Sequence, residues 1–91
     1  MPKRTDSTQA SIFRAWRQVG ATVQSLHTVG DGAPDALVGF RGMNYVAEIK
    51  TPRGRLTPAQ VRWHRDWRGQ VAIVETVDEA LAVLGVIRAG V

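Results

Sequence analysis

Three charged residues stand at the ends of two apolar segments. Asp35 opens "DALVGF", and Glu48 and Lys50 close "YVAEIK". Buried strands usually avoid charges, so these three side chains call for an explanation. Two carboxylates about 4 Å apart repel by roughly 4 kcal/mol at a surface-like dielectric constant. A divalent cation offsets that repulsion, and oxygen ligands of this kind suit Mg²⁺ or Mn²⁺.

The two apolar segments predict an antiparallel hairpin. With its turn at residues 41–44, Asp35 falls roughly opposite Lys50, and Leu37 falls opposite Glu48. Side chains alternate between the two faces of a strand, so Asp35 shares a face with Glu48 and lies diagonal to it. The alternative is a plain ion pair between Lys50 and one carboxylate. That alternative is favoured for a lone Glu-x-Lys, but the position of Asp35 after "GAP" favours a metal site.

The predicted chemistry is metal-assisted hydrolysis of a phosphodiester bond. The expected ligands are the carboxylates of Asp35 and Glu48 and the main-chain carbonyl of Ile49. A cation held there would polarise a phosphoryl oxygen and lower the pKa of a bound water. Lys50 would position that water or stabilise the charge that develops on phosphorus.

The remaining segments predict an α/β domain. A first helix begins at Asp6 or Ser7, and the later helices are capped by Thr57 and Thr76. The expected order is α-β-β-β-α-β-α, with a mixed four-stranded sheet flanked by helices. The expected helices cover residues 5–20, 57–69 and 76–85, and the expected strands cover residues 21–29, 36–40, 45–50 and 70–75.

The composition predicts one soluble domain over residues 1–91, with residues 1–6 as a flexible basic arm. The chain has no cysteine, which excludes disulfides, thiolate zinc sites and a cysteine nucleophile. This fits a reducing cytosol, and a cytoplasmic location is expected. No apolar run is long enough to span a membrane. Lys and Arg number 12 against 8 acidic residues, and only two of the 12 are lysines. Arginine suits phosphate groups, so this balance favours a polyanionic partner.

The quoted residues also carry a resemblance to a known family. "PD" followed by "EIK" resembles the PD-(D/E)xK nuclease superfamily, and "GAPDALVG", "YVAEIK", "GRLTPAQ" and "GQVAIVETVDEAL" resemble its VRR-NUC domain. The resemblance implies a restriction-endonuclease-like core, dependence on Mg²⁺ or Mn²⁺, and no organic cofactor. Asp35 and Glu48 match the family's metal-binding acids, and Lys50 matches its catalytic lysine. Gln60 matches a glutamine that borders the site; the alternative is an ordinary polar residue at a helix start.

Small stand-alone members of this family resemble phage-type Holliday-junction resolvases that act as homodimers. The implied function is a structure-selective endonuclease acting on branched DNA, in a phage, plasmid or bacterial context. Two readings stay open: a non-catalytic DNA-binding or assembly module, and a flap nuclease or exonuclease. One departure concerns the first helix, which lacks the glutamate that the family often has there. Asp6 or Gln9 could replace it, or one metal ion could suffice.

Basic residues near the predicted site are candidates for DNA contact. Arg53 and Arg55 flank Gly54 in the loop after the Glu48 strand, where they could bind phosphate or simply be solvated. The further candidates are Arg14, Arg62, Lys3 and Arg4. No base-reading element is evident, so recognition by backbone and shape is expected.

Aromatic residues and histidines complete the candidates. Trp63 and Trp67, one turn apart, are predicted to anchor their helix in the core, with base stacking as a minor option. His64 either approaches the active site or is a partly exposed helix residue, and the second reading is favoured. His27 is expected on the first strand in a structural role.

Overall fold

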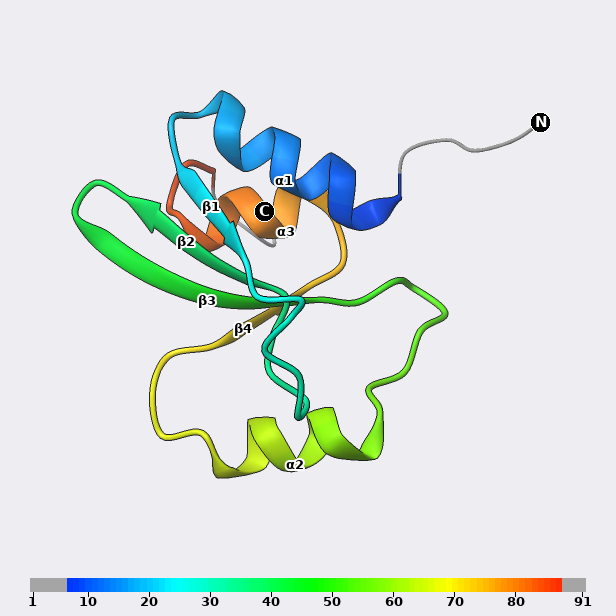
Figure 1. Cartoon of the computed structure of the whole chain (residues 1–91). Helices are drawn as coiled ribbons and strands as arrows, with labels where there is room; N and C mark the ends of the chain where they lie inside the picture. Colours follow the sequence, from blue (N-terminus) through cyan, green and yellow to red (C-terminus); the bar gives the residue numbers. More distant parts are fainter. Residues whose placement is uncertain (1–6, 88–91) are drawn as a thin grey trace.

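The computed structural model describes residues 7–87, so Lys3 and Arg4 of the predicted arm lie outside the described residues. Its sheet has the order β1-β2-β3-β4, with antiparallel pairs β1–β2 and β2–β3 and a parallel pair β3–β4. This confirms the predicted mixed four-stranded sheet flanked by helices (Figure 1). The elements are α1 (Thr8–Gln18), β1 (Thr22–Ser25), β2 (Ala36–Phe40), β3 (Met43–Ile49), α2 (Pro58–Asp66), β4 (Ala72–Val74) and α3 (Val77–Val83).

The helix starts follow from local side-chain chemistry. Ser7, Thr57 and Thr76 each accept a hydrogen bond from a backbone N–H in the first turn of α1, α2 and α3. The first strand is shorter than predicted, because β1 ends at Ser25 and His27 lies in the turn that follows. None of the helices within residues 7–87 has the length and apolar character needed to cross a bilayer.

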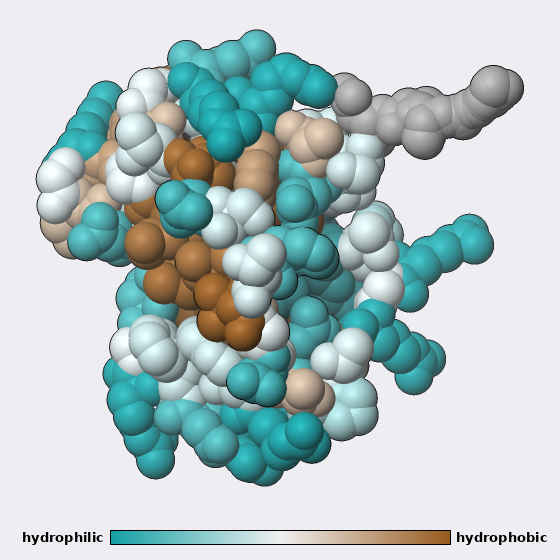
Figure 2. All heavy atoms as spheres, viewed as in Figure 1, coloured by the Kyte–Doolittle hydropathy of each residue, from teal (hydrophilic) through white to brown (hydrophobic). Residues whose placement is uncertain are grey.

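The hydrophobic core lies between one face of the sheet and the helices α1 and α3 (Figure 1). Trp16 on α1 is fully buried, and its indole Nε1 donates a hydrogen bond to the carbonyl oxygen of Ala80 on α3 at 2.9 Å. Val38 and Ala47 bring the central strands to the same core. Figure 2 shows apolar side chains gathered between the hydrophilic surfaces of α1 and α2. The central strands β2 and β3 are therefore packed against α1 and α3 on this face of the sheet.

The hairpin turn is tighter than the sequence predicted. Arg41 and Gly42 both have positive φ, at 52° and 79°, as a two-residue type I′ turn requires. Ala36 therefore pairs with Ala47, and one further step places Asp35 opposite Glu48. The predicted diagonal placement is wrong by two residues. Because the shift is even, every side chain keeps the face that was predicted for it.

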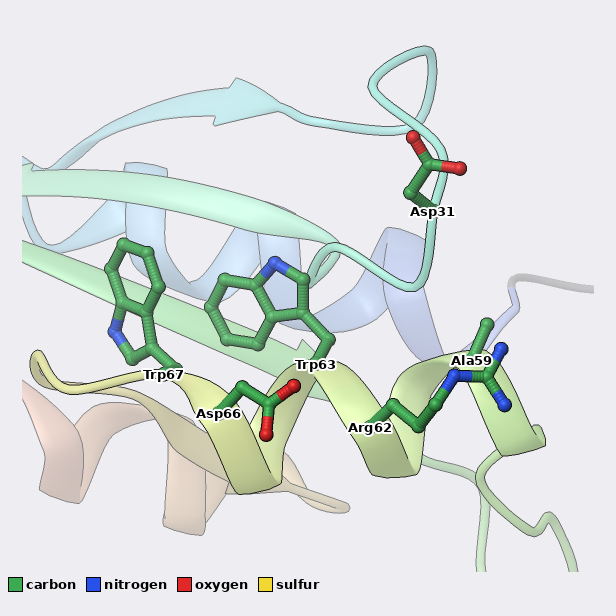
Figure 3. A pocket seen from close by; sticks show the side chains of 6 residues that line it. All are labelled: Asp31, Ala59, Arg62, Trp63, Asp66 and Trp67. Atoms are coloured by element: carbon green, nitrogen blue, oxygen red, sulfur yellow. The ribbon is translucent and has the colours of Figure 1, made fainter.

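Helix α2 lies on the other side of the sheet and contributes no residue to the core (Figure 1). Trp63 and Trp67 stack on each other, with ring centroids 4.5 Å apart. Both side chains rise from α2 toward the strands (Figure 3), yet Trp67 is 44 % exposed. The prediction that this pair anchors α2 in the core is wrong. The two indoles instead form one wall of an open pocket between α2 and the loop at Asp31.

The loop before Asp35 packs tightly on the start of α2. Gly32 has a φ of +79°, and a Cβ atom there would collide with the carbonyl of Ala59. Gly30 in the same loop has a φ of +76° but open space around it. A substitution at either glycine would strain the backbone, but only a substitution at Gly32 would also cause a steric clash with α2.

We expect Gly32→Ala to lower the free energy of unfolding by about 1–3 kcal/mol more than Gly30→Ala does. Both substitutions strain the backbone, but only the first pushes the loop away from α2. Urea unfolding of the two variants measures the difference. Equal losses would mean that the contact between the loop and α2 contributes no stability.

Candidate active site

Asp35 is fixed by the edge of the strand beside it. Its backbone N–H donates to the carbonyl of Ala47 at 3.1 Å, and its carboxylate Oδ2 accepts from the backbone N–H of Ile49 at 2.6 Å. Pro34, which precedes it, is fully buried and restricts the chain entering the strand. The side chain of Asp35 is therefore held beside Glu48, and Ile49 belongs to the same cluster through its main chain.

Glu48 is the only buried charged residue among those described, with 2 % of its surface exposed. Loss of hydration, and after it the hydrogen bond with Asp35 and the repulsion from its charge, together raise the pKa of Glu48 to about 8. Its Oε1 is buried and has no hydrogen-bond partner. A buried acid with an unpartnered oxygen beside a second carboxylate is an arrangement that a cation would relieve.

Helix α2 contributes Gln60 to this cluster. The amide oxygen of Gln60 accepts from the backbone N–H of Thr57 at 2.8 Å, which closes the capping box at the start of α2. This bond fixes which way the amide points. Its Nε2 donates to Oε2 of Glu48 at 3.2 Å. Gln60 therefore both begins the helix and holds one oxygen of Glu48, so the two readings of this residue are compatible.

His64, one turn along α2, also faces Glu48. Its Nε2 lies 3.5 Å from Oε1 of Glu48, and 13 % of its side chain is exposed. His64 is therefore a partly exposed helix residue, as the favoured prediction has it, and it also approaches the site, as the alternative has it. Gln60 and His64 are four residues apart and so lie on one face of α2. This spacing is the feature of the sequence that predicts that both side chains approach Glu48.

Lys50 is paired with an acid that the sequence analysis did not single out. Its Nζ donates to Oε2 of Glu75 at 3.1 Å, and both side chains are partly exposed. The plain ion pair with Asp35 or Glu48 is thus not what forms. The signal lay in the parallel pairing of β3 with β4, where Ile49 pairs with Val74 and the next residues come side by side.

A small cleft of about 170 Å³ opens over this cluster. Glu48, Lys50, Gln60 and Arg55 line it together with the loop at Gly54. Arg53 is exposed on that loop but does not line the cleft. The structure places the other described arginine candidates elsewhere: Arg14 lies on α1 in a pocket with Gln9, and Arg62 lies in the pocket of the two tryptophans.

The donor set fits a divalent cation. Asp35 and Glu48 could supply carboxylate oxygens, and the carbonyl of Ile49 belongs to the same stretch of β3. Within residues 7–87 no three His, Asp, Glu or Cys side chains converge closely enough to enclose an ion by themselves. The other ligands would be the main chain and water, which Mg²⁺ commonly keeps. Gln9 lies in a separate pocket on α1, so nothing places it beside Glu48.

The raised pKa of Glu48 makes the stability of the cation-free protein depend on pH. Protonation of Glu48 stabilises the folded state fully below its unfolded value of 4.5, and this stabilisation is lost as pH rises through about 8. Glu48→Gln removes this titration. In EDTA we expect the variant to match the wild type at pH 5 and to exceed it at pH 9 by a few kcal/mol, at about 1.4 kcal/mol per unit.

Thermal unfolding of both proteins across that pH range measures the effect. Added Mn²⁺ should raise the stability of the wild type at pH 9 and leave that of the variant unchanged, because only the charged carboxylate binds the ion strongly. Parallel stability curves for the two proteins would contradict this account of Glu48.

The fold and the cluster define an α/β domain whose paired carboxylates meet at the end of a β-hairpin. The chain is similar to a solved VRR_NUC domain, with 25 % sequence identity and a TM-score of 0.65. The similarity covers 86 % of this chain and 90 % of that one. It confirms the resemblance drawn from the sequence and gives the protein a nuclease-type fold. The chain matches no protein-family model and no curated protein.

Proposed function

We propose that the protein is a metal-dependent, structure-selective DNA endonuclease that hydrolyses phosphodiester bonds in branched DNA. The observation that carries this proposal is the convergence of Asp35 and Glu48, together with a cleft that Glu48 and Lys50 both line. The nuclease-type fold supports it independently. A bound Mg²⁺ or Mn²⁺ would polarise the scissile phosphate and lower the pKa of the attacking water.

The chain's own residues supply the remaining functions. Asp35, Glu48 and the Ile49 carbonyl hold the cation. Lys50 faces the same cleft and stabilises the negative charge that develops on the phosphate oxygens. Gln60 orients Glu48 through the hydrogen bond to its Oε2.

Substrate contacts come from the basic residues around the cleft. Arg55 lines the cleft itself, and Arg53 is exposed two residues away on the same loop. A net charge of +4 supports binding to a polyanion. A two-fold homodimer would present two such sites to two strands, as paired cuts in a four-way junction require.

The test compares a labelled four-way junction with a matching linear duplex and a flap, in Mg²⁺ and in Mn²⁺. Symmetric nicks in the junction that EDTA abolishes are the expected result. Cleavage of the flap or the duplex instead would support the proposed active site but contradict the proposed preference for a junction. Junction binding without cleavage in either metal would refute the enzyme and favour a DNA-binding module.

A further inference from the structure

The open pocket beside α2 has the features of a site for a flat aromatic ligand. Its volume is about 420 Å³, within the range of about 300–1,000 Å³ that small-molecule sites occupy. The residues that line it are Asp31, Ala59, Arg62, Trp63, Asp66 and Trp67 (Figure 3). In that view the indole of Trp63 lies between Trp67 and the loop at Asp31. One face of Trp63 is stacked on Trp67, and the other face is therefore turned toward the pocket.

Both indoles are held in place before any ligand binds. Nε1 of Trp67 donates a hydrogen bond to the carbonyl of Gln70 at 3.0 Å. The side chain of Gln70 is in turn bonded to the N–H and the carbonyl of Val46 on β3, at 2.7 and 3.2 Å. Trp63 is stacked on Trp67, and the imidazole of His64 contacts it edge-on with centroids 5.4 Å apart. A planar ligand would therefore stack on an ordered surface, which lowers the entropic cost of binding.

The charges around the pocket favour a nucleobase over a phosphate group. Asp31 and Asp66 place two carboxylates on its lining. Hydrogen bonds from Arg65 lower the pKa of Asp66, so that this carboxylate is ionised at neutral pH. Carboxylates repel phosphate oxygens, but they accept hydrogen bonds from the amino groups on the edges of bases. Arg62 on the same lining supplies a positive charge for the DNA backbone beside the base.

Helix α2 connects this pocket to the candidate active site. Gln60, whose amide is bonded to Glu48, lies three residues before Trp63, so the two side chains are neighbours on the helix surface. A base stacked on Trp63 would therefore belong to a nucleotide close to the phosphate at the cleft. Taking a base out of a duplex costs a few kcal/mol, and the cost is smallest for a base that is unpaired.

We propose that the indole of Trp63, supported by Trp67, is a stacking site for an unpaired nucleobase of the DNA substrate. This inference rests on the proposed function, because it takes DNA as the ligand of the same protein surface. Stacking on an aromatic side chain tolerates any base, so the site selects DNA by its unpaired nucleotide and not by its sequence. The protein should therefore favour DNA with an unpaired base near the cut over fully paired DNA.

The test measures the affinity of the full chain for three matched duplexes in EDTA, where cleavage does not interfere. The first duplex carries one unpaired nucleotide, the second has an abasic nucleotide at that position, and the third is fully paired. The first should bind about 5- to 150-fold more tightly than the second, which corresponds to the roughly 1–3 kcal/mol that one stacked base contributes. Trp63→Leu should bind the first two equally, because leucine is apolar but has no ring face. Val61→Ala, at an exposed position of α2 outside the pocket, should keep the full preference.

A second readout uses the unsubstituted chain and so does not depend on how a variant folds. Replacing the unpaired base with 2-aminopurine should give a fluorescence signal that is quenched on binding, as stacking on an indole requires. Absence of quenching would overturn this inference. Equal affinity for the unpaired base and the abasic nucleotide, or a preference that survives in Trp63→Leu, would also overturn it and leave the proposed nuclease intact. A preference that Trp63→Leu abolishes would support the stacking site even if no DNA were cleaved in Mg²⁺ or Mn²⁺, a result that would refute the nuclease alone.

Discussion

Replacing Lys50 with alanine is expected to slow single-turnover DNA cleavage by about 10²- to 10³-fold, the usual cost of removing one group that stabilises transition-state charge. Lys50 lines the cleft beside Glu48, and Glu75 restrains its ammonium group on the side of β4. The loss should fall on the chemical step. DNA affinity should change by no more than a few fold, because one positive charge among many contributes little to binding.

Arg68→Ala is the matched control for this prediction. It removes one positive charge from an exposed position that does not line the cleft. Both variants should show a similar small loss of DNA affinity, and only Lys50→Ala should lose the cleavage rate. Equal cleavage rates in the two variants would show that Lys50 acts only as a general positive charge.

Replacing Trp16 with alanine is expected to lower the free energy of unfolding by about 3–5 kcal/mol. Trp16 is fully buried at the junction of α1, α3 and the sheet, where its removal leaves a large cavity. It also leaves the carbonyl of Ala80 without its indole donor. Small domains have only about 5–15 kcal/mol of stability in total, so this single change approaches unfolding.

Two further variants separate the causes. Trp16→Phe keeps a six-membered ring but loses the N–H donor and part of the buried indole, so a smaller cost of about 1–3 kcal/mol is expected. Trp67→Ala removes an indole that is 44 % exposed outside the core, and a much smaller loss is expected. Urea unfolding measures the free energy of unfolding of all three variants, provided that its dependence on urea concentration has the same slope in each. If Trp67→Ala matched Trp16→Ala, the assignment of the core to α1 and α3 would be wrong.

The hairpin illustrates how far the sequence carries the site. The alternation of apolar residues predicted that Asp35 and Glu48 lie on the same face of the sheet, and this shared face brings the two carboxylates together. The turn was harder, because Arg41 adopts a left-handed conformation that its residue type does not announce. A register error of two residues leaves facing unchanged, so the candidate site survived an incorrect turn.

The residues that were misjudged all depend on contacts between distant segments. The helical period predicts that Gln60, His64 and Trp63 lie near one another on α2. It does not predict which other segment packs against them. Whether α2 packs in the core or beside the site is decided by its approach to the far face of the sheet, which local sequence does not encode. Glu75 became a partner of Lys50 only once the parallel register of β3 and β4 was set.

The central claim is that Asp35 and Glu48 hold a divalent cation. Crystals grown with Mn²⁺ and measured near the manganese absorption edge test it most directly. The account predicts an anomalous peak in contact with both carboxylates and the carbonyl of Ile49. Manganese bound only elsewhere on the protein, with no peak beside Asp35 and Glu48, would contradict the account.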